Sequence, residues 1–263
     1  MRSTVLEYDV SKVVELGRAG KRIDGRALDE MRSFTIDVNK YENAEGSARI
    51  FLGETEIAAG VKFEVGKPYP DSPNEGSISV GVELLPLAHS EYESGPPSMD
   101  EIEIARVVDR GLRESKALDF EKMCIKEGEA VWVACLDFCV INSNGNLFDA
   151  GSIAGLVAMK SAKLPKLNED NKIVKHEYEG EMPLKRLPLL TTFVKVGGKI
   201  MLDPSYLEEK AAEARFSVAT TEDNYLCAMQ KGLGGTFSMD EINYMIDKAF
   251  ETGKEVRKKI AKL

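Results

Sequence analysis

Three arginines recur at helical spacing in the first half of the chain: Arg106, Arg110 and Arg113. Positions i, i+4 and i+7 share one face of an α-helix, so their guanidinium groups project from a single stripe. A guanidinium group is planar and can bind a phosphate through two hydrogen bonds at once, so this stripe can hold a phosphate backbone. Alternatively, Glu103 and Asp109 are near enough in sequence to form ion pairs with these arginines. The stripe would then be only a solvated helix face with no binding function.

A second candidate for phosphate binding is the run Asp149-Ala150-Gly151-Ser152, between a predicted strand and a predicted helix. Free backbone N–H groups at the start of a helix can hold an anion. The same pattern also arises when Asp149 or Ser152 simply caps the helix. Ile153 stands where a cation would strengthen anion binding, so a phosphate site here would be weak.

A third group consists of acidic residues in a predicted helical segment: Asp203, Glu208, Glu209 and Glu213. Carboxylates at such spacing can bind a metal ion or transfer a proton. Lys210 and Arg215 lie among them, and mixed charge runs of this kind are usually solvated helix faces. The pattern alone therefore favours a solvated helix face over a metal-binding or proton-transferring site.

The cysteines and histidines give a metal site little support. Cys135 and Cys139 lie four residues apart in an apolar strand-like run and so share one face. We expect the cysteines to be thiols of the core, because free cysteine is often buried. His89 and His176 are isolated from other ligand types. The four cysteines, which form no C-x-x-C pair, are Cys124, Cys135, Cys139 and Cys227.

Size and charge limit the classes of protein to consider. The chain has 263 residues and a formal net charge of −9, enough length for one large α/β domain or two small ones. Residues 1–20 mix charges with apolar residues, and no run approaches membrane-spanning length, so we expect a cytoplasmic protein. Because phosphate neutralisation needs local excess of Lys and Arg, any nucleic-acid contact of this acidic chain must be local.

Periodicity predicts the elements that position these residues. Ser98 and Glu101 form a capping-box pair in front of a predicted helix over residues 99–116, which carries the three arginines. A second helix is expected after residues 149–155. An N-terminal helix ends at Gly17 and Gly20. Strands are expected at 48–52, 56–63, 77–85 and 130–141.

The second half of the chain repeats this order after a polar stretch at residues 165–183. A Gly197-Gly198 hairpin turn is expected there, and a long closing helix follows Ser238. The expected strands are 191–196, 199–202, 216–220 and 225–230. The predicted fold class is α+β, with two related lobes of mixed β-sheet and helices packed on them. We place an N-terminal helical extension at 1–24, lobe 1 at 25–165 and lobe 2 at 185–263.

Six short motifs follow one another along nearly the whole chain: 22–26 (RIDGR), 45–48 (EGSA), 68–71 (PYPD), 103–110 (EIARVVDR), 149–152 (DAGS) and 228–231 (AMQK). In this order they resemble the ribonuclease PH family, and most closely the non-catalytic ribonuclease-PH-like subunit of the archaeal exosome ring. The resemblance implies a ribonuclease-PH-like fold for both lobes.

Three positions depart from the active members of that family. Their phosphate-binding Gly-Thr/Ser-Arg turn matches Gly151-Ser152-Ile153, a degenerate phosphate loop without the arginine. Their adjacent arginines match residues 96–99 (PPSM). Their two metal-assisting aspartates, six residues apart, match Glu209 and Arg215, a degenerate acidic site. The resemblance therefore implies no catalytic residue, no metal and no cofactor in this chain.

For function, the resemblance implies a non-catalytic, RNA-binding subunit of a phosphorolytic 3′→5′ exoribonuclease ring. Arg106, Arg110 and Arg113 would hold the RNA backbone next to the active site of a catalytic paralogue, where inorganic phosphate and Mg²⁺ are expected. Three copies of each would alternate in a hexameric ring that carries RNA-binding cap proteins and passes single-stranded RNA, with no membrane involved. Two alternatives stay open: an active phosphorolytic exoribonuclease using Glu209, and a metabolic enzyme binding a phosphorylated small molecule at Gly151-Ser152.

Overall fold

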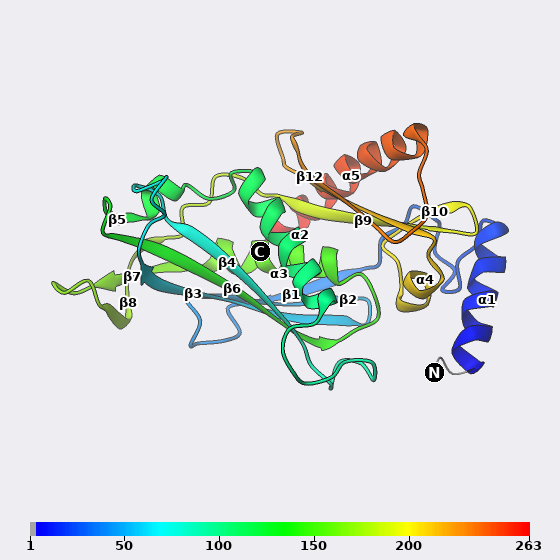
Figure 1. The fold of residues 1–263 in the computed structure, drawn as a ribbon, viewed down its shortest axis with the longest axis horizontal. Helices are drawn as coiled ribbons and strands as arrows, with labels where there is room; N and C mark the ends of the chain where they lie inside the picture. The colour runs from blue at the N-terminus through cyan, green and yellow to red at the C-terminus, as the bar shows by residue number, and fades with distance from the viewer. Residues whose placement is uncertain (1–3) are drawn as a thin grey trace.

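Two β-sheets with helices packed on them form the body of the molecule in this computed structural model, which describes residues 4–263 (Figure 1). The first sheet has the order β1-β2-β3-β6-β4, with β5 paired to β6. Only β4 and β6 run parallel in it, so the sheet is mixed as predicted. Its strands are β1 (Phe34–Val38), β2 (Gly46–Leu52), β3 (Thr55–Gly66), β4 (Ser77–Leu84), β5 (Cys124–Lys126) and β6 (Ala130–Asn142).

The second sheet is antiparallel throughout, in the order β10-β9-β11-β12. The turn between β9 and β10 has positive φ at Gly197 and Gly198, which explains the two glycines predicted to form it. Its strands are β9 (Leu189–Val196), β10 (Lys199–Leu202), β11 (Ala214–Thr220) and β12 (Leu226–Gly232).

The helices follow from capping and periodicity. Both hydrogen bonds of the Ser98–Glu101 capping box are present, and the helix they start packs on β4 and β12. The closing helix packs on β9 and β11 and also begins with a capping box, at Ser238. The helices are α1 (Thr4–Arg18), α2 (Met99–Glu114), α3 (Leu147–Ser161), α4 (Tyr206–Ala211) and α5 (Met239–Ile260), with a short 3-10 helix at Phe120–Met123.

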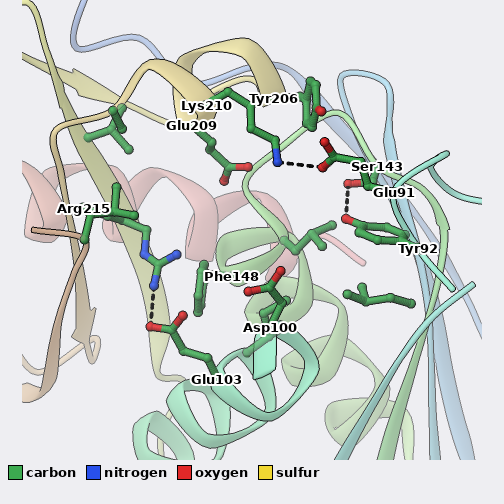
Figure 2. A pocket seen from close by; sticks show the side chains of 16 residues that line it. Glu91, Tyr92, Asp100, Glu103, Ser143, Phe148, Tyr206, Glu209, Lys210 and Arg215 are labelled. Carbon is green, nitrogen blue, oxygen red and sulfur yellow. Dashed lines mark hydrogen bonds and ion pairs between the residues drawn. The ribbon is translucent and has the colours of Figure 1, made fainter. Parts of the chain in front are cut away.

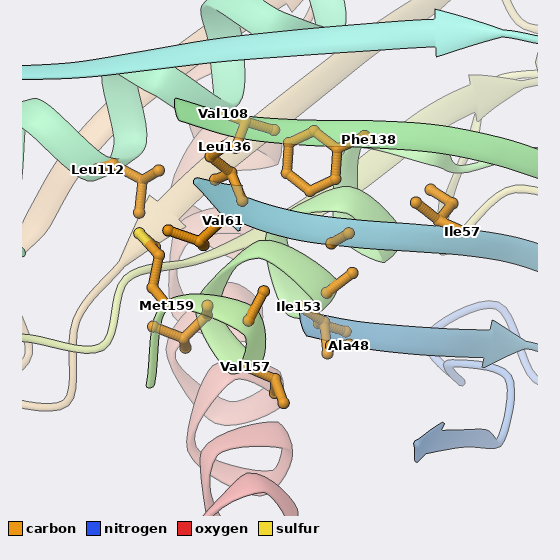
Figure 3. Close-up of a cluster of buried hydrophobic side chains, with 14 of the residues drawn as sticks. Ala48, Ile57, Val61, Val108, Leu112, Leu136, Phe138, Ile153, Val157 and Met159 are labelled. Atoms are coloured by element: carbon orange, nitrogen blue, oxygen red, sulfur yellow. The ribbon is translucent and has the colours of Figure 1, made fainter. Parts of the chain in front are cut away.

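Helix α3 is the centre of the core. It contacts β2, β3 and β6 of the first sheet and β9 of the second, and Figure 3 shows Ile153, Val157 and Met159 among the side chains of the sheet and of α2. A Cβ on Gly155 would lie 2.8 Å from the ring of Phe138, so a glycine allows the close approach of helix and strand. The same hydrophobic cluster includes Leu190 of β9, so one core joins the two halves.

Two elements differ from the sequence prediction. Helix α3 begins at Leu147, several residues before the predicted start, because Asn146 adopts a left-handed conformation and caps it with its side chain. The polar stretch after α3 is an ordered hairpin of β7 (Lys163–Leu167) and β8 (Ile173–Glu181), which are paired only with each other. Strand β1 was not predicted, although its sequence FTIDV alternates apolar and polar residues; Phe34, Ile36 and Val38 pack against the core.

The prediction of core thiols is wrong for Cys135 and Cys139. Residues of β6 alternate between the buried face and an outer face, and both cysteines lie with Asp137 on the outer one. All four cysteines are free and partly exposed. Cys227 does pack against the core, where burial raises the pKa of its thiol to about 11. No helix within residues 4–263 is long and apolar enough to cross a membrane.

Candidate nucleic-acid interface and the adjoining cavity

Helix α2 presents Arg106 and Arg110 to solvent, opposite the apolar residues that it buries. The guanidinium group of Arg110 donates to the side-chain oxygen of Gln230 on β12, at 3.2 Å. Within the described part of the chain, Arg106 forms no ion pair. The side chain of Arg113 is partly buried; it pairs with Asp109 at 2.8 Å and donates to the carbonyl oxygen of Ile78 on β4. The stripe predicted from the spacing therefore consists of two available arginines and one that anchors the helix.

A groove of about 330 Å³ runs between α2 and β4, beside these arginines. Tyr69 from the 68–71 loop lines it together with Arg106 and Arg113, and the tyrosine is 61% exposed. An exposed aromatic ring next to cations is the combination that single-stranded nucleic-acid sites share, because bases stack on the ring while cations hold phosphates. Sequence reasoning treated Tyr69 only as part of a motif and missed its position. We call this feature the Tyr69 groove.

A second cavity, of about 380 Å³, lies between α2, α4 and β11 (Figure 2). Figure 2 shows the side chain of Glu209 reaching into the cavity from α4 and that of Arg215 reaching in from β11. At its rim Lys210 pairs with Glu91 at 2.6 Å. We call it the Glu209 cavity; its charged lining residues are Glu91, Asp100, Glu103, Glu209, Lys210 and Arg215.

The electrostatics of the Glu209 cavity are set by one partly buried acid, Glu209, and one cation that is already paired, Arg215. Burial raises the pKa of Glu209 to about 7. Three groups oppose this by lowering the pKa: the N–H of Asn146, which donates to the carboxylate at 2.8 Å, and the charges of Arg215 and Arg32. The guanidinium group of Arg215 pairs with Glu103 of α2 and lies over the ring of Phe148, 4.3 Å from its centroid. Among the described residues, the carboxylate of Glu209 forms no ion pair, and Arg215 is already paired with Glu103.

The described residues form neither a cluster of metal ligands nor an open phosphate loop at residues 151–153. Within residues 4–263, no three His, Cys, Asp or Glu side chains converge as metal ligands. The Gly151-Ser152-Ile153 segment lies inside α3, where its N–H groups belong to the helix. Ser152 accepts a hydrogen bond from the N–H of Leu190, and Ile153 is 1% exposed in the core. The anion site predicted at 149–152 is therefore wrong, as is the description of 151–153 as a loop.

Two of the other acidic residues of the predicted cluster, Asp203 and Glu208, are buried ion-pair partners. Glu208 is fully buried and pairs with the buried Arg22, whose Nε lies 2.8 Å from its carboxylate. Asp203 pairs with Arg26 at 3.1 Å and with Arg32 at 2.8 Å. Glu213 is exposed and only accepts from the N–H of Gly198. Asp203 and Glu208 therefore belong neither to a solvated helix face nor to a set of metal ligands, and both predictions are wrong for these two residues.

These ion pairs explain the motif at residues 22–26 and were missed in the sequence. The guanidinium group of Arg22 also donates to the carbonyl oxygens of Leu202 and Asp203, at 2.7 and 2.9 Å. These three partners, Glu208, Leu202 and Asp203, lie 180 or more residues away along the chain, so no local pattern marks them. The motif fastens the segment after α1 to the second lobe.

Residues 30–165 match the 3′ exoribonuclease family, domain 1, and residues 186–252 match domain 2 of the same family. The chain belongs to the 3′ exoribonuclease family. Among curated members, it is 44% identical to an exosome complex component Rrp42 of Thermococcus kodakarensis, over 95% of this chain and 93% of the relative. It is 42% identical to the Rrp42 of Thermoplasma acidophilum, over 92% and 91% of the two chains.

Solved structures of the 3′ exoribonuclease family agree with this assignment. A chain of the Archaeoglobus fulgidus exosome with RNA bound to the active site superposes with a TM-score of 0.92 at 37% identity, covering 98% of this chain and 99% of that one. A chain of an archaeal exosome core gives 0.87 at 35% identity, covering 98% of each. The ribonuclease-PH-like fold and the resemblance to the archaeal exosome subunit are thereby confirmed.

Proposed function

We propose that this chain is a non-catalytic, RNA-binding subunit of an archaeal exosome, a phosphorolytic 3′→5′ exoribonuclease ring. The observation that carries the proposal is a contrast between two neighbouring surfaces. Helix α2 offers Arg106 in the lining of the Tyr69 groove and the exposed Arg110 one turn further along. The Glu209 cavity, by contrast, has Arg215, already paired with Glu103, where a second acid would be needed. The chain keeps groups that hold RNA and lacks groups that cleave it.

The RNA contact would be to the backbone. Arg106 and Arg110 can each bind a phosphate, and Tyr69 can stack one base without selecting it. Arg113 lines the same groove and adds positive charge, although Asp109 and the carbonyl group of Ile78 hold its guanidinium group. Such a surface would bind single-stranded RNA with little sequence preference.

Catalysis would come from a partner. Phosphorolysis requires a bound phosphate as nucleophile and a cation that stabilises the leaving oxygen. A catalytic paralogue would supply the site for inorganic phosphate and Mg²⁺, with three copies of each chain alternating in a hexameric ring under RNA-binding cap proteins in the cytoplasm. The relatives named as exosome components and the RNA-bound exosome structure support this assembly.

The RNA-binding part of the proposal is tested with Arg110→Ala in the ring assembled with its paralogue. Loss of one phosphate contact should weaken the Kd for oligoadenylate roughly five- to tenfold and lower the salt slope of log Kd by about 0.7. Fluorescence anisotropy over a salt series measures both. Arg18→Ala on α1, another exposed helical arginine, is the matched control. An unchanged affinity and slope for Arg110→Ala would contradict the proposal.

The non-catalytic part has one specific rival, because a carboxyl group with a pKa of about 7 is suited to general acid or base chemistry. We expect the chain alone to release no nucleoside diphosphate from oligoadenylate with phosphate and Mg²⁺, and the mixture with the paralogue to be active. In that mixture Glu209→Gln should retain turnover within about twofold. Activity of the lone chain that Glu209→Gln abolishes would establish the rival.

A further inference from the structure

The ion pair between Arg215 and Glu103 joins the two lobes at the helix that carries the exposed arginines. Arg215 belongs to β11 of the second sheet, and Glu103 lies one turn before Arg106 on α2. Only 16% of the Arg215 side chain and 32% of the Glu103 side chain are exposed. Because both side chains are partly buried, solvent and salt screen this pair less than a fully exposed pair. Figure 2 shows it closing one side of the Glu209 cavity.

The surrounding chain is shaped to hold the guanidinium group of Arg215. Phe148 of α3 lies under it at 4.3 Å, an arrangement that favours a cation. Gly232 of β12 lies opposite Arg215 in the sheet register. A Cβ at position 232 would be only 2.7 Å from a guanidinium nitrogen, so the absence of a side chain there makes room for the arginine.

Helix α2 is fixed to both lobes by polar contacts along one edge. Arg113 donates to β4 of the first sheet, whereas Arg110 and Glu103 reach β12 and β11 of the second. Glu103 and Arg110 are seven residues apart and so share a face. The position of Arg110 and Arg106 relative to the second lobe therefore depends on the Glu103 contact at the start of the helix.

We propose that Arg215 is a positioning residue: by pairing with Glu103 it holds α2 so that Arg106 and Arg110 face the RNA path. This inference rests on the proposed function. An acid at position 215 would repel Glu103, since like charges at contact distance destabilise each other. The arginine at position 215 therefore does two things. It replaces a carboxylate of the active relatives, and it attaches the RNA-binding helix α2 to the second lobe.

The test uses the ring assembled with its paralogue and measures the Kd for oligoadenylate and amide hydrogen exchange of α2. Arg215→Met should weaken the Kd about three- to fivefold and speed exchange in residues 99–114. The exchanged pair Arg215→Glu with Glu103→Arg should return both values to within about twofold of the unmodified ring. Lys195→Met, which breaks a pair of similar exposure between β9 and α5, should change neither.

The result that overturns the proposal is an unchanged Kd for Arg215→Met in a ring where Arg110→Ala weakens binding. A loss that the exchanged pair does not restore would also overturn it. If Arg110→Ala has no effect, the proposed RNA-binding function fails first, and the two failures are distinguishable. Should Arg215→Met prevent assembly, Gly232→Ala keeps both charges and crowds the guanidinium group, so it should weaken the Kd in the same direction.

Discussion

At Glu209, burial opposes ionisation and raises the pKa of the carboxyl group to about 7. A raised pKa means that the folded chain binds a proton more tightly than the unfolded chain, whose carboxyl has its ordinary value of 4.5. The stabilising effect is fully present below pH 4.5 and is lost as pH rises through 7. Burial also raises the pKa of Asp149 to about 7, with the same sign. The pKa of Asp203 is lowered, so its contribution is lost only in acid, below this window.

We therefore predict that the free energy of unfolding decreases between pH 5 and pH 8. Glu209→Gln removes one of the two carboxyl groups whose pKa is raised to about 7 and should roughly halve the decrease. Glutamine can still accept from the N–H of Asn146. Urea unfolding at several pH values measures it. Glu114→Gln, at an exposed position, is the control. An identical pH dependence for Glu209→Gln and the unmodified chain would contradict the assignment.

Some of the candidate site residues could be predicted from their spacing in the sequence, and others could not. The shared stripe of Arg106 and Arg110 followed from helical geometry alone. That Glu209 and Arg215 belong to one degenerate site came only from the family resemblance, and that both line one cavity came only from the structure. Tyr69 was overlooked because the loop that carries it has no periodic pattern. Contacts between distant segments leave no local trace in a sequence.

At the scale of elements, the start of α2 is determined by its cap. Ser98 accepts from the N–H of Glu101, and the Glu101 carboxylate accepts from the N–H groups of Ser98 and Leu84. The Leu84 contact ties the first turn of the helix to the end of β4. These hydrogen bonds orient the turn that carries Glu103 and so support the arginines beyond it.

Replacing Ser98 by Ala should lower the free energy of unfolding by about 1 kcal/mol, because the N–H of Glu101 loses its acceptor. Hydrogen exchange should rise first in the opening turn of α2. Ser94→Ala, an exposed serine in the preceding loop, should have no effect on either measurement. Equal stability of the two variants would show that the cap is not needed.

Capping also explains where element prediction succeeded and where it failed. The starts of α2 and α5 were predicted because their serine and glutamate caps are visible in the sequence. The start of α3 was missed because Asn146, its left-handed cap, stands in a run of turn-forming residues. The small residues at 149–152 then suggested a loop, whereas they lie inside α3, whose residues 147–159 are all buried.

At the scale of the whole molecule, buried charges join the segment after α1 to the second lobe. Arg22→Met would leave the fully buried carboxylate of Glu208 without a cation, and we expect a loss of about 3–5 kcal/mol in the free energy of unfolding. The double variant with Glu208→Gln should recover part of that loss, because no unpaired charge remains. Chemical denaturation compares the two. A loss below about 1 kcal/mol for Arg22→Met would contradict this role.

The burial of α3 between the two sheets has a consequence for how the protein can be produced. Helix α3 belongs to the first lobe, yet Leu190 of the second lobe packs in the same hydrophobic cluster. If the folded protein were cut at the tip of the β7–β8 hairpin, the two pieces should stay together, because their apolar surfaces are already packed against each other. Each piece synthesised separately would expose apolar surface that the other normally covers, so the two should be soluble only when translated together.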